Sequence, residues 1–288
     1  MKGVTLLELV VTIVVLGIIA AVASLFLQPA LESYFATQRR AEIADVADTA
    51  MRRMTRDIRL ALPNSARVDG TSRFLEILMT KNGGRYRALN DDDSPAATTE
   101  DPLDFSTPDS AFDTLGLLPA SGDQQVQPND YVVIHNLGIA GADAYDPAAA
   151  DPNIARIAAF GAGALADEQR ITLTAATRFP LESPGRRFFV VSGPVTFACL
   201  GVGTAAGEGT GTLRRWSSYA IEPRGGVPPT TLPGGATDAL LASNVSACQL
   251  DYTTLPMLGR GLVVVRIAIT RASETVTLYF EAHINNVP

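Results

Sequence analysis

One carboxylate, Glu8, lies inside an otherwise uncharged apolar stretch near the start of the chain. The stretch runs from Val4 to Leu27, and Glu8 is the only ionisable side chain in it. A carboxylate in such a run costs free energy to insert into lipid, and charges of this kind usually have a partner of opposite sign. The position therefore indicates that Glu8 meets a positive group.

The element that holds Glu8 has the length and composition of a membrane-spanning helix. As a helix, residues 4–27 extend about 36 Å, which is enough to cross a bilayer with some tilt. Because backbone groups in lipid must be satisfied within the segment, a helix is expected despite the many β-branched residues. Lys2 precedes the stretch, and Glu8 is the only charge between Lys2 and residue 32. This asymmetry predicts a cytoplasmic N-terminus.

The first residues match a known processing motif, in the run Lys2-Gly3-Val4-Thr5-Leu6-Leu7-Glu8-Leu9. The run resembles the leader and methylation motif of type IV prepilins, which is a short basic leader ending in Gly, an apolar residue, then Thr, Leu, an aliphatic residue, Glu and Leu. The resemblance implies that prepilin peptidase cuts between Gly3 and Val4 on the cytoplasmic side, and that the α-amine of Val4 is N-methylated. The family most often has Phe where this chain has Val4. Cleavage in the family depends mainly on the glycine that ends the leader, and this chain has it as Gly3.

The same resemblance gives Glu8 a role. After cleavage, the charged amine of Val4 would lie at the positive end of the helix dipole. Glu8 lies one turn further on and could pair with it internally. In the family, this Glu is thought to pair with the amine of a neighbouring subunit, so the resemblance implies that Glu8 sets the register between subunits.

Two other interpretations of the N-terminus remain open. A secretory signal peptide could be removed at Ala21-Val22-Ala23, which has the small-x-small pattern of a cleavage site. An ordinary signal anchor needs no cleavage at all. Both interpretations leave Glu8 unexplained.

Two cysteines, Cys199 and Cys248, lie in the C-terminal half. Two thiols cannot form a four-ligand zinc site, and only His135 and His283 could add to them. If the body lies outside the cytoplasm, a disulfide is expected. Two free buried thiols are the alternative. A bridge would close a loop of about 50 residues and stabilise the fold by roughly 4 kcal/mol on the chain-entropy model.

Other residues that could carry chemistry lack the necessary context. His135 and His283 are far apart in sequence and are expected to be strand residues. The glycines at 201–211 lack the lysine and the strand-to-helix setting of a phosphate loop, and no serine lies in a nucleophile elbow. Two acidic groups could bind calcium, but neither matches an EF-hand, so solvated loops are expected; they comprise Asp91, Asp92 and Asp93, and Asp143, Asp146 and Asp151. We predict no enzyme activity, no cofactor and no metal site.

Composition excludes one class of partner. The 288-residue chain has a net charge of −7, with 47% apolar and 18% charged residues. Broad nucleic-acid binding needs a basic stripe that meets phosphates. The densest basic stretch, at 52–59, alternates arginines with Asp57 and apolar residues, so no nucleic-acid partner is expected. The apolar content is sufficient for a sizeable core.

After Pro29, which is expected to interrupt and kink the apolar helix, the pattern becomes amphipathic. Apolar residues recur at spacings of three and four up to Leu62, and charged residues fill most other positions. This predicts a surface helix with one buried stripe, ended by Pro63. The predicted stripe is Ile43, Val46, Ala47, Ala50, Met51, Met54, Ile58 and Leu62.

The remaining residues predict a β-rich body. The clearest pattern is a hairpin of 261–270 and 275–284 around Ala272-Ser273, with apolar and polar residues alternating in its second strand. Loops are expected at 90–121, 140–151 and 223–235. The other strand candidates are 74–78, 131–135, 170–173, 188–191, 195–199 and 214–221.

The expected fold is therefore α+β and pilin-like: a long N-terminal helix, transmembrane and then amphipathic, packed on an antiparallel β-rich globular domain. Its expected divisions are a prepilin leader at 1–3, a transmembrane helix at 4–29, an amphipathic half-helix at 30–62 and an extracytoplasmic body at 63–288.

A second resemblance covers most of the chain. It is carried by the runs at 191–199, 212–216, 241–248 and 283–288, which look like those of minor-pilin-like components of the mannose-sensitive haemagglutinin (MSHA) pilus system. It implies a minor structural subunit that takes part in pilus assembly. The implied partners are prepilin peptidase, other pilin subunits, inner-membrane assembly proteins and the membrane. The implied location is the inner membrane, with a periplasmic body, or a pilus on the cell surface.

Two alternatives use the same anchor. In the first, the body is a tip adhesin that contacts a surface through its acidic loops and Trp216. In the second, the chain is a pseudopilin of a type II secretion system. Pilus loss on deletion favours the assembly subunit, whereas normal pili with lost adhesion favour the adhesin.

Overall fold

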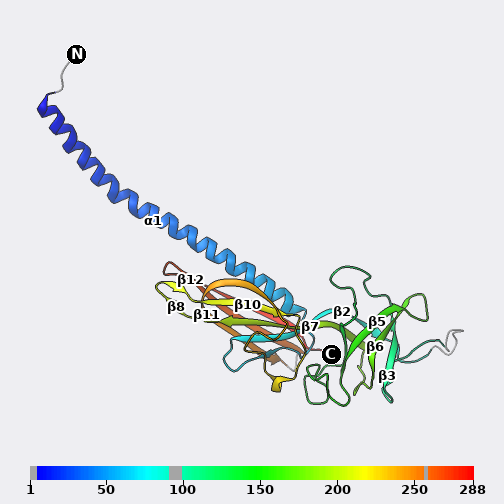
Figure 1. Cartoon of the computed structure of the whole chain (residues 1–288). Coiled ribbons are helices and arrows are strands. Elements are labelled where there is room, and N and C mark those ends of the chain that lie inside the picture. The colour runs from blue at the N-terminus through cyan, green and yellow to red at the C-terminus, as the bar shows by residue number, and fades with distance from the viewer. Residues whose placement is uncertain (1–4, 91–98, 256–258) are drawn as a thin grey trace.

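The computed structural model describes residues 5–90, 99–255 and 259–288. One long helix, α1 (Leu6–Arg59), projects from an elongated β-rich body (Figure 1). The layout is α+β, with a single N-terminal helix followed by a large antiparallel sheet, as the sequence predicts at this level.

The body contains thirteen described strands and one turn of 3-10 helix, η1 (Arg224–Gly226). In chain order the strands are β1 (Arg67–Val68), β2 (Phe74–Tyr86), β3 (Asp109–Leu115), β4 (Tyr131–Ile134), β5 (Ile154–Ala162), β6 (Glu168–Thr177), β7 (Arg187–Leu200), β8 (Thr204–Ala205), β9 (Glu208–Gly209), β10 (Gly211–Ser217), β11 (Thr237–Leu255), β12 (Arg260–Arg271) and β13 (Glu274–Asn285).

The helix is continuous through Pro29, so the predicted interruption was wrong. A proline removes one backbone donor, and a long helix can absorb this loss by bending; α1 curves along its length in Figure 1. The helix ends at Arg59, and Leu60 caps its C-terminus.

The second half of α1 covers a sheet in the order β2-β7-β10-β11-β12-β13. The predicted stripe is confirmed at six of its eight positions. Val46 is 42% exposed because it lies on the solvent side of the helix, and Leu62 is buried but lies beyond the end of the helix. Opposite the helix, inward side chains from all six strands of this sheet form the rest of the core. The buried helix residues of this core are Ile43, Ala47, Ala50, Met51, Met54 and Ile58.

The far part of the body is a small closed barrel that the sequence did not predict. Strand β2 pairs with β3, β3 with β6, β6 with β5, β5 with β4, β4 with β7, and β7 again with β2. The ring has its own core, which includes Phe112, Ile171 and Phe188. Since β2 and β7 run through both the barrel and the helix-covered sheet, these two strands join the two parts of the body.

Three differences from the predicted strands follow from this barrel. Strand β3 falls inside the predicted loop 90–121, and β5 was not predicted at all. Residues 91–98 of that loop lie outside the described residues. Strands β2 and β7 are longer than predicted, because each continues from one part of the body into the other. The loops at 140–151 and 223–235 are confirmed apart from η1.

A carboxylate on β2, Glu76, is fully buried and held by groups from two other segments, β1 and the loop after β10. Arg67 donates to Glu76 Oε2 at 2.5 Å, and Tyr219 donates to Oε1 at 2.7 Å. The Arg67 guanidinium also donates to the carbonyls of Glu222 and Pro223, and it lies 3.5 Å from the ring centroid of Tyr145. This cluster ties the loop that follows β10 to the sheet.

The predicted hairpin is confirmed as β12–β13, joined by the two residues Ala272 and Ser273. Their φ angles are +49° and +65°, which is the left-handed pair that a type I′ turn requires. Ala and Ser both pay a conformational cost there. We expect Ala272→Asn/Ser273→Gly to raise the free energy of unfolding by roughly 1 kcal/mol.

Thermal unfolding of the full chain in detergent micelles measures this effect. The paired control is Ser273→Gly alone, which should give part of the increase. A double variant no more stable than the unaltered chain would show that the turn is not strained.

Candidate assembly site

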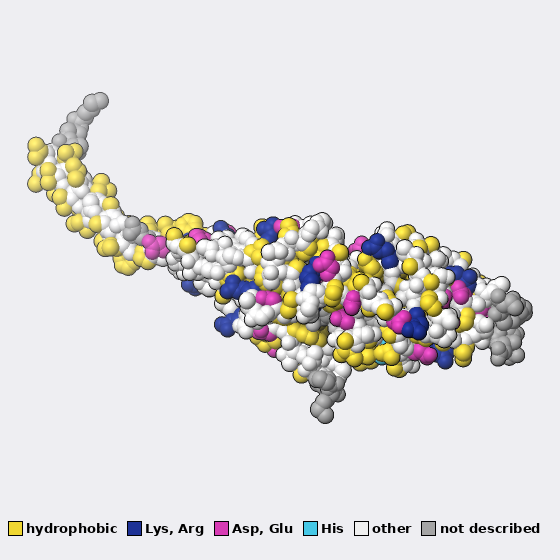
Figure 2. All heavy atoms as spheres, turned by 60° about the horizontal axis from the view of Figure 1, so that its bottom comes forward, with side chains coloured by type: hydrophobic (Ala, Val, Ile, Leu, Met, Phe, Trp, Pro, Cys, Tyr) yellow, Lys and Arg dark blue, Asp and Glu magenta, His cyan; other side chains and the backbone are white. Residues whose placement is uncertain are grey.

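The first half of α1 projects away from the body (Figure 1). Its most apolar stretch contains no buried residue, and it is long and apolar enough to cross a membrane. Figure 2 shows apolar side chains around this projecting part of the helix. An uncovered apolar helix of this length needs either lipid or other helices around it.

Glu8 lies in the first turn of this helix and is exposed. The helix begins after Thr5, whose Oγ1 accepts a hydrogen bond from Glu8 N at 3.3 Å, so Thr5 is the N-cap. The positions predicted for cleavage and methylation, Gly3 and Val4, lie outside the described residues. The motif threonine and glutamate therefore share one helix end, where the dipole favours a negative side chain.

The helix leaves the body beside the tip of the β12–β13 hairpin. Arg39 and Arg40 both pair with Glu274, at 3.3 Å and 2.7 Å, and the Glu274 side chain is only 15% exposed. Two arginines on one carboxylate fix where the helix leaves the body. Sequence reasoning missed this contact. The sequence offered only two separate signals, which were a glutamate directly after the predicted turn and a pair of arginines in the helix.

The two cysteines are joined as predicted. Cys199 on β7 and Cys248 on β11 form a disulfide between strands that flank β10, and the Cys199 side chain is buried in the core beneath α1. The link holds the long strand β11 against the central strands.

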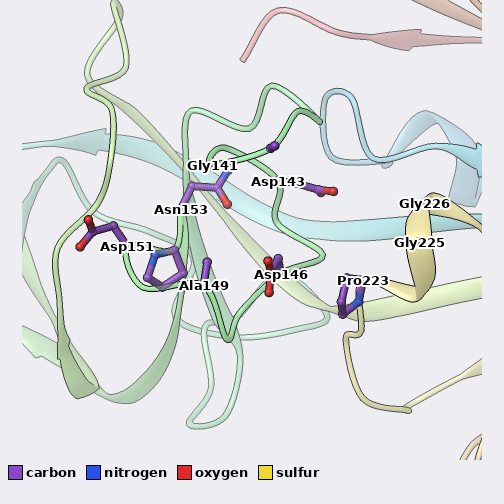
Figure 3. Close-up of a pocket in the computed structure, with 11 residues that line it drawn as sticks. Gly141, Asp143, Asp146, Ala149, Asp151, Asn153, Pro223, Gly225 and Gly226 are labelled. Atoms are coloured by element: carbon purple, nitrogen blue, oxygen red, sulfur yellow. The ribbon is translucent and has the colours of Figure 1, made fainter.

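Asp143, Asp146 and Asp151 line one small cavity, but they do not converge on a shared point (Figure 3). Asp151 is instead paired with Arg178, whose hydrogen bond lowers the pKa of that carboxyl. Asp143 accepts from the backbone N of Tyr145 at 3.0 Å. Across the described ranges, no three His, Cys, Asp or Glu residues are grouped to hold a metal ion. Asp91, Asp92 and Asp93 lie outside those ranges.

Three predictions about side chains of the body can be compared with the structure. Trp216 is 1% exposed and packs against Phe74, so its predicted role as a surface contact was wrong. Its side chain lies in a buried cluster with Phe74, Ala198 and Tyr219. His283 lies on β13 as predicted, whereas His135 falls just after β4, with a φ of +47°.

No family model, no curated protein and no solved structure matches this chain. The structure by itself defines a class: a protein with one uncovered apolar N-terminal helix whose second half forms part of the core of a large antiparallel β body.

Proposed function

We propose that the chain is a minor-pilin-like structural subunit that takes part in the assembly of a type IV pilus of the MSHA kind. The runs at 191–199, 212–216, 241–248 and 283–288 resemble those of MshO, a minor-pilin-like component of that system. In this proposal, prepilin peptidase removes residues 1–3, Val4 becomes the N-methylated first residue, and the apolar helix holds the subunit in the inner membrane. The body then faces the periplasm.

The observation that carries this proposal is the position of the motif on the helix. The run from Gly3 to Glu8 lies at the start of a helix whose first half is bare and apolar and whose second half forms part of the core of the body. A signal peptide removed after Ala23 would discard the first half of a helix that continues unbroken to Arg59. The bare half supplies an anchor, and it also supplies a surface that can pack against the helices of other subunits.

Glu8 is then the group that pairs with a neighbouring subunit. We expect Glu8→Ala to reduce incorporation of the subunit into purified pili about tenfold or more, because an uncompensated amine in an apolar environment is costly. Cleavage after Gly3 should be unaffected. Immunoblots of sheared pili and of membranes measure the two quantities separately.

The matched control is Glu32→Ala, which removes a carboxylate from the same helix outside the apolar stretch and should leave incorporation unchanged. Normal incorporation of the Glu8→Ala subunit would contradict the proposal. Normal pili without any of this chain, combined with lost adhesion, would favour a tip adhesin. A secretion defect with normal pili would favour a type II secretion pseudopilin.

A further inference from the structure

Strand β13 is a long sheet edge, and its second side is unpaired among the described strands. It pairs with β12 over its whole length, and no other described strand pairs with its second side. Natural edges are usually protected by proline, lysine, a bulge or a short strand. β13 has twelve residues and contains no proline, lysine or glycine, and its register with β12 is unbroken.

The register of the hairpin shows which backbone groups are free to pair. Because a two-residue turn joins Arg271 to Glu274, these two form a hydrogen-bonded pair, and hydrogen-bonded pairs then alternate along the ladder. The even-numbered residues of β13 therefore bond to β12. The N–H and C=O groups that point outward belong to Thr275, Thr277, Tyr279, Glu281, His283 and Asn285.

The helix-facing side of this edge is incompletely covered. Val276, Leu278 and Phe280 point toward α1 but are only half-buried. Their direct partners on β12 are Ile269, Ile267 and Val265, which are 2%, 1% and 2% exposed. At these three positions the core is closed over β12 and partly open over β13, whereas Ala282 and Ile284 further along β13 are buried.

A groove of about 410 Å³ lies between α1 and Phe280, and its rim is basic. Arg52 and Arg56 have side chains that are 75% exposed, and Arg59 is also exposed. Arg52 is paired with Asp48, while the nearest carboxylate to Arg56, that of Asp57, is already held by Arg215 at 2.8 Å. Arg59 has no ion pair within the described part of the chain. The rim therefore carries surplus positive charge.

We propose that the β13 edge binds an extended acidic segment of another protein, which adds to the sheet as a further strand beneath the arginines of α1. The outward N–H and C=O groups of β13 would form backbone hydrogen bonds with the segment. The half-buried side chains of Val276, Leu278 and Phe280, together with Leu60, would contact its apolar residues. The arginines would select glutamate or aspartate on its helix-facing side. This inference does not rest on the pilin assignment, because it uses only the body and the covered half of α1.

The test uses the full chain in detergent micelles and a synthetic peptide of about ten residues, in which threonine alternates with valine or glutamate. A matched peptide has lysine in place of glutamate. Fluorescence anisotropy gives the affinities. We expect only the acidic peptide to bind, with slowed hydrogen exchange at the outward amides of Thr277, Tyr279 and Glu281.

Two variants separate the two parts of the site. Arg56→Glu/Arg59→Glu should weaken binding of the acidic peptide by about tenfold or more, while the matched control Arg53→Glu, on the same helix but outside the groove, should change it less than about twofold. Thr277→Pro removes one outward N–H without touching the β12–β13 ladder and should also abolish binding; circular dichroism checks its fold.

Several results would overturn the proposal. These are no binding of the acidic peptide at millimolar concentration, equal binding of both peptides, or equal loss in Arg53→Glu and Arg56→Glu/Arg59→Glu. A full chain that already dimerises, and that becomes monomeric in Thr277→Pro, would overturn it in favour of a second copy at the same edge.

Discussion

Replacing Arg67 by Ala is expected to lower the free energy of unfolding of the body by about 3 to 5 kcal/mol, because it leaves the fully buried Glu76 without its main partner. Tyr219 would still donate one hydrogen bond, and Arg224 would remain 3.6 Å away. The guanidinium's bonds to two loop carbonyls would also be lost. For a body of this size, the expected fall in Tm is about 6 to 20 °C.

The loss should depend on pH in a definite direction. Burial raises the pKa of Glu76 above its ordinary value of 4.5, and Arg67 offsets this only in part. A raised folded-state pKa gives a contribution that is fully present below the ordinary pKa and is lost as pH rises through the folded value. Without Arg67 the folded pKa rises further, so the variant should be more destabilised, relative to the unaltered chain, at about pH 8 than at about pH 4.

A paired variant distinguishes the stranded charge from simple loss of packing. Arg67→Met/Glu76→Leu removes both charges and keeps most of the volume, so it should recover most of the stability lost in Arg67→Ala. A double variant as unstable as Arg67→Ala, or a loss in Arg67→Ala that is the same at both pH values, would show that Glu76 is not a buried charge held by Arg67.

Removing the disulfide is expected to have an effect of similar size. Cys199 and Cys248 are 49 residues apart, and closing such a loop stabilises by roughly 4 kcal/mol on the chain-entropy model. We expect Cys199→Ala/Cys248→Ala to lower Tm by about 8 to 16 °C. Thermal scans of the full chain in micelles, with and without a reducing agent, provide the measurement.

The reducing agent supplies the control for this prediction. It should lower the Tm of the unaltered chain toward that of the double variant, and it should leave the variant itself unchanged. If the variant and the unaltered chain unfolded at the same temperature under oxidising conditions, the link between β7 and β11 would have no part in stability.

Local patterns predicted the parts of the fold whose contacts are close in sequence. The stripe on α1 and the β12–β13 hairpin both have a clear period, and both were found. The continuity of α1 through Pro29 was missed, because the proline signal is local and the helix is stabilised by its whole length.

The barrel could not be predicted, because it depends on pairings between distant strands. β3 is short, lies between polar segments and pairs with β6, which follows it by more than fifty residues. β2 and β7 each run through both the barrel and the helix-covered sheet, and no periodicity in the sequence indicates this. The burial of Trp216 follows from the same long-range packing.

The features of the candidate site also differ in how far they could be predicted from the sequence. The motif from Gly3 to Glu8 is a contiguous pattern, and its role stays a prediction. The cysteine pair was predicted, and the structure joins it. The ion pairs of Arg39 and Arg40 with Glu274 join residues more than 230 positions apart, so no local pattern indicates them. The half-covered edge of β13 is defined by which neighbour is missing, and only the assembled sheet shows it.

The measurement that bears most directly on the proposed function is the N-terminus of the chain isolated from membranes of cells that contain prepilin peptidase. Mass spectrometry of the intact protein and of its first proteolytic peptide gives both the cleavage position and any added methyl group. We predict a chain that begins at Val4 with an N-methylated amine and retains the whole of α1. A chain that begins at Met1, or one cut after Ala23, would contradict the proposal.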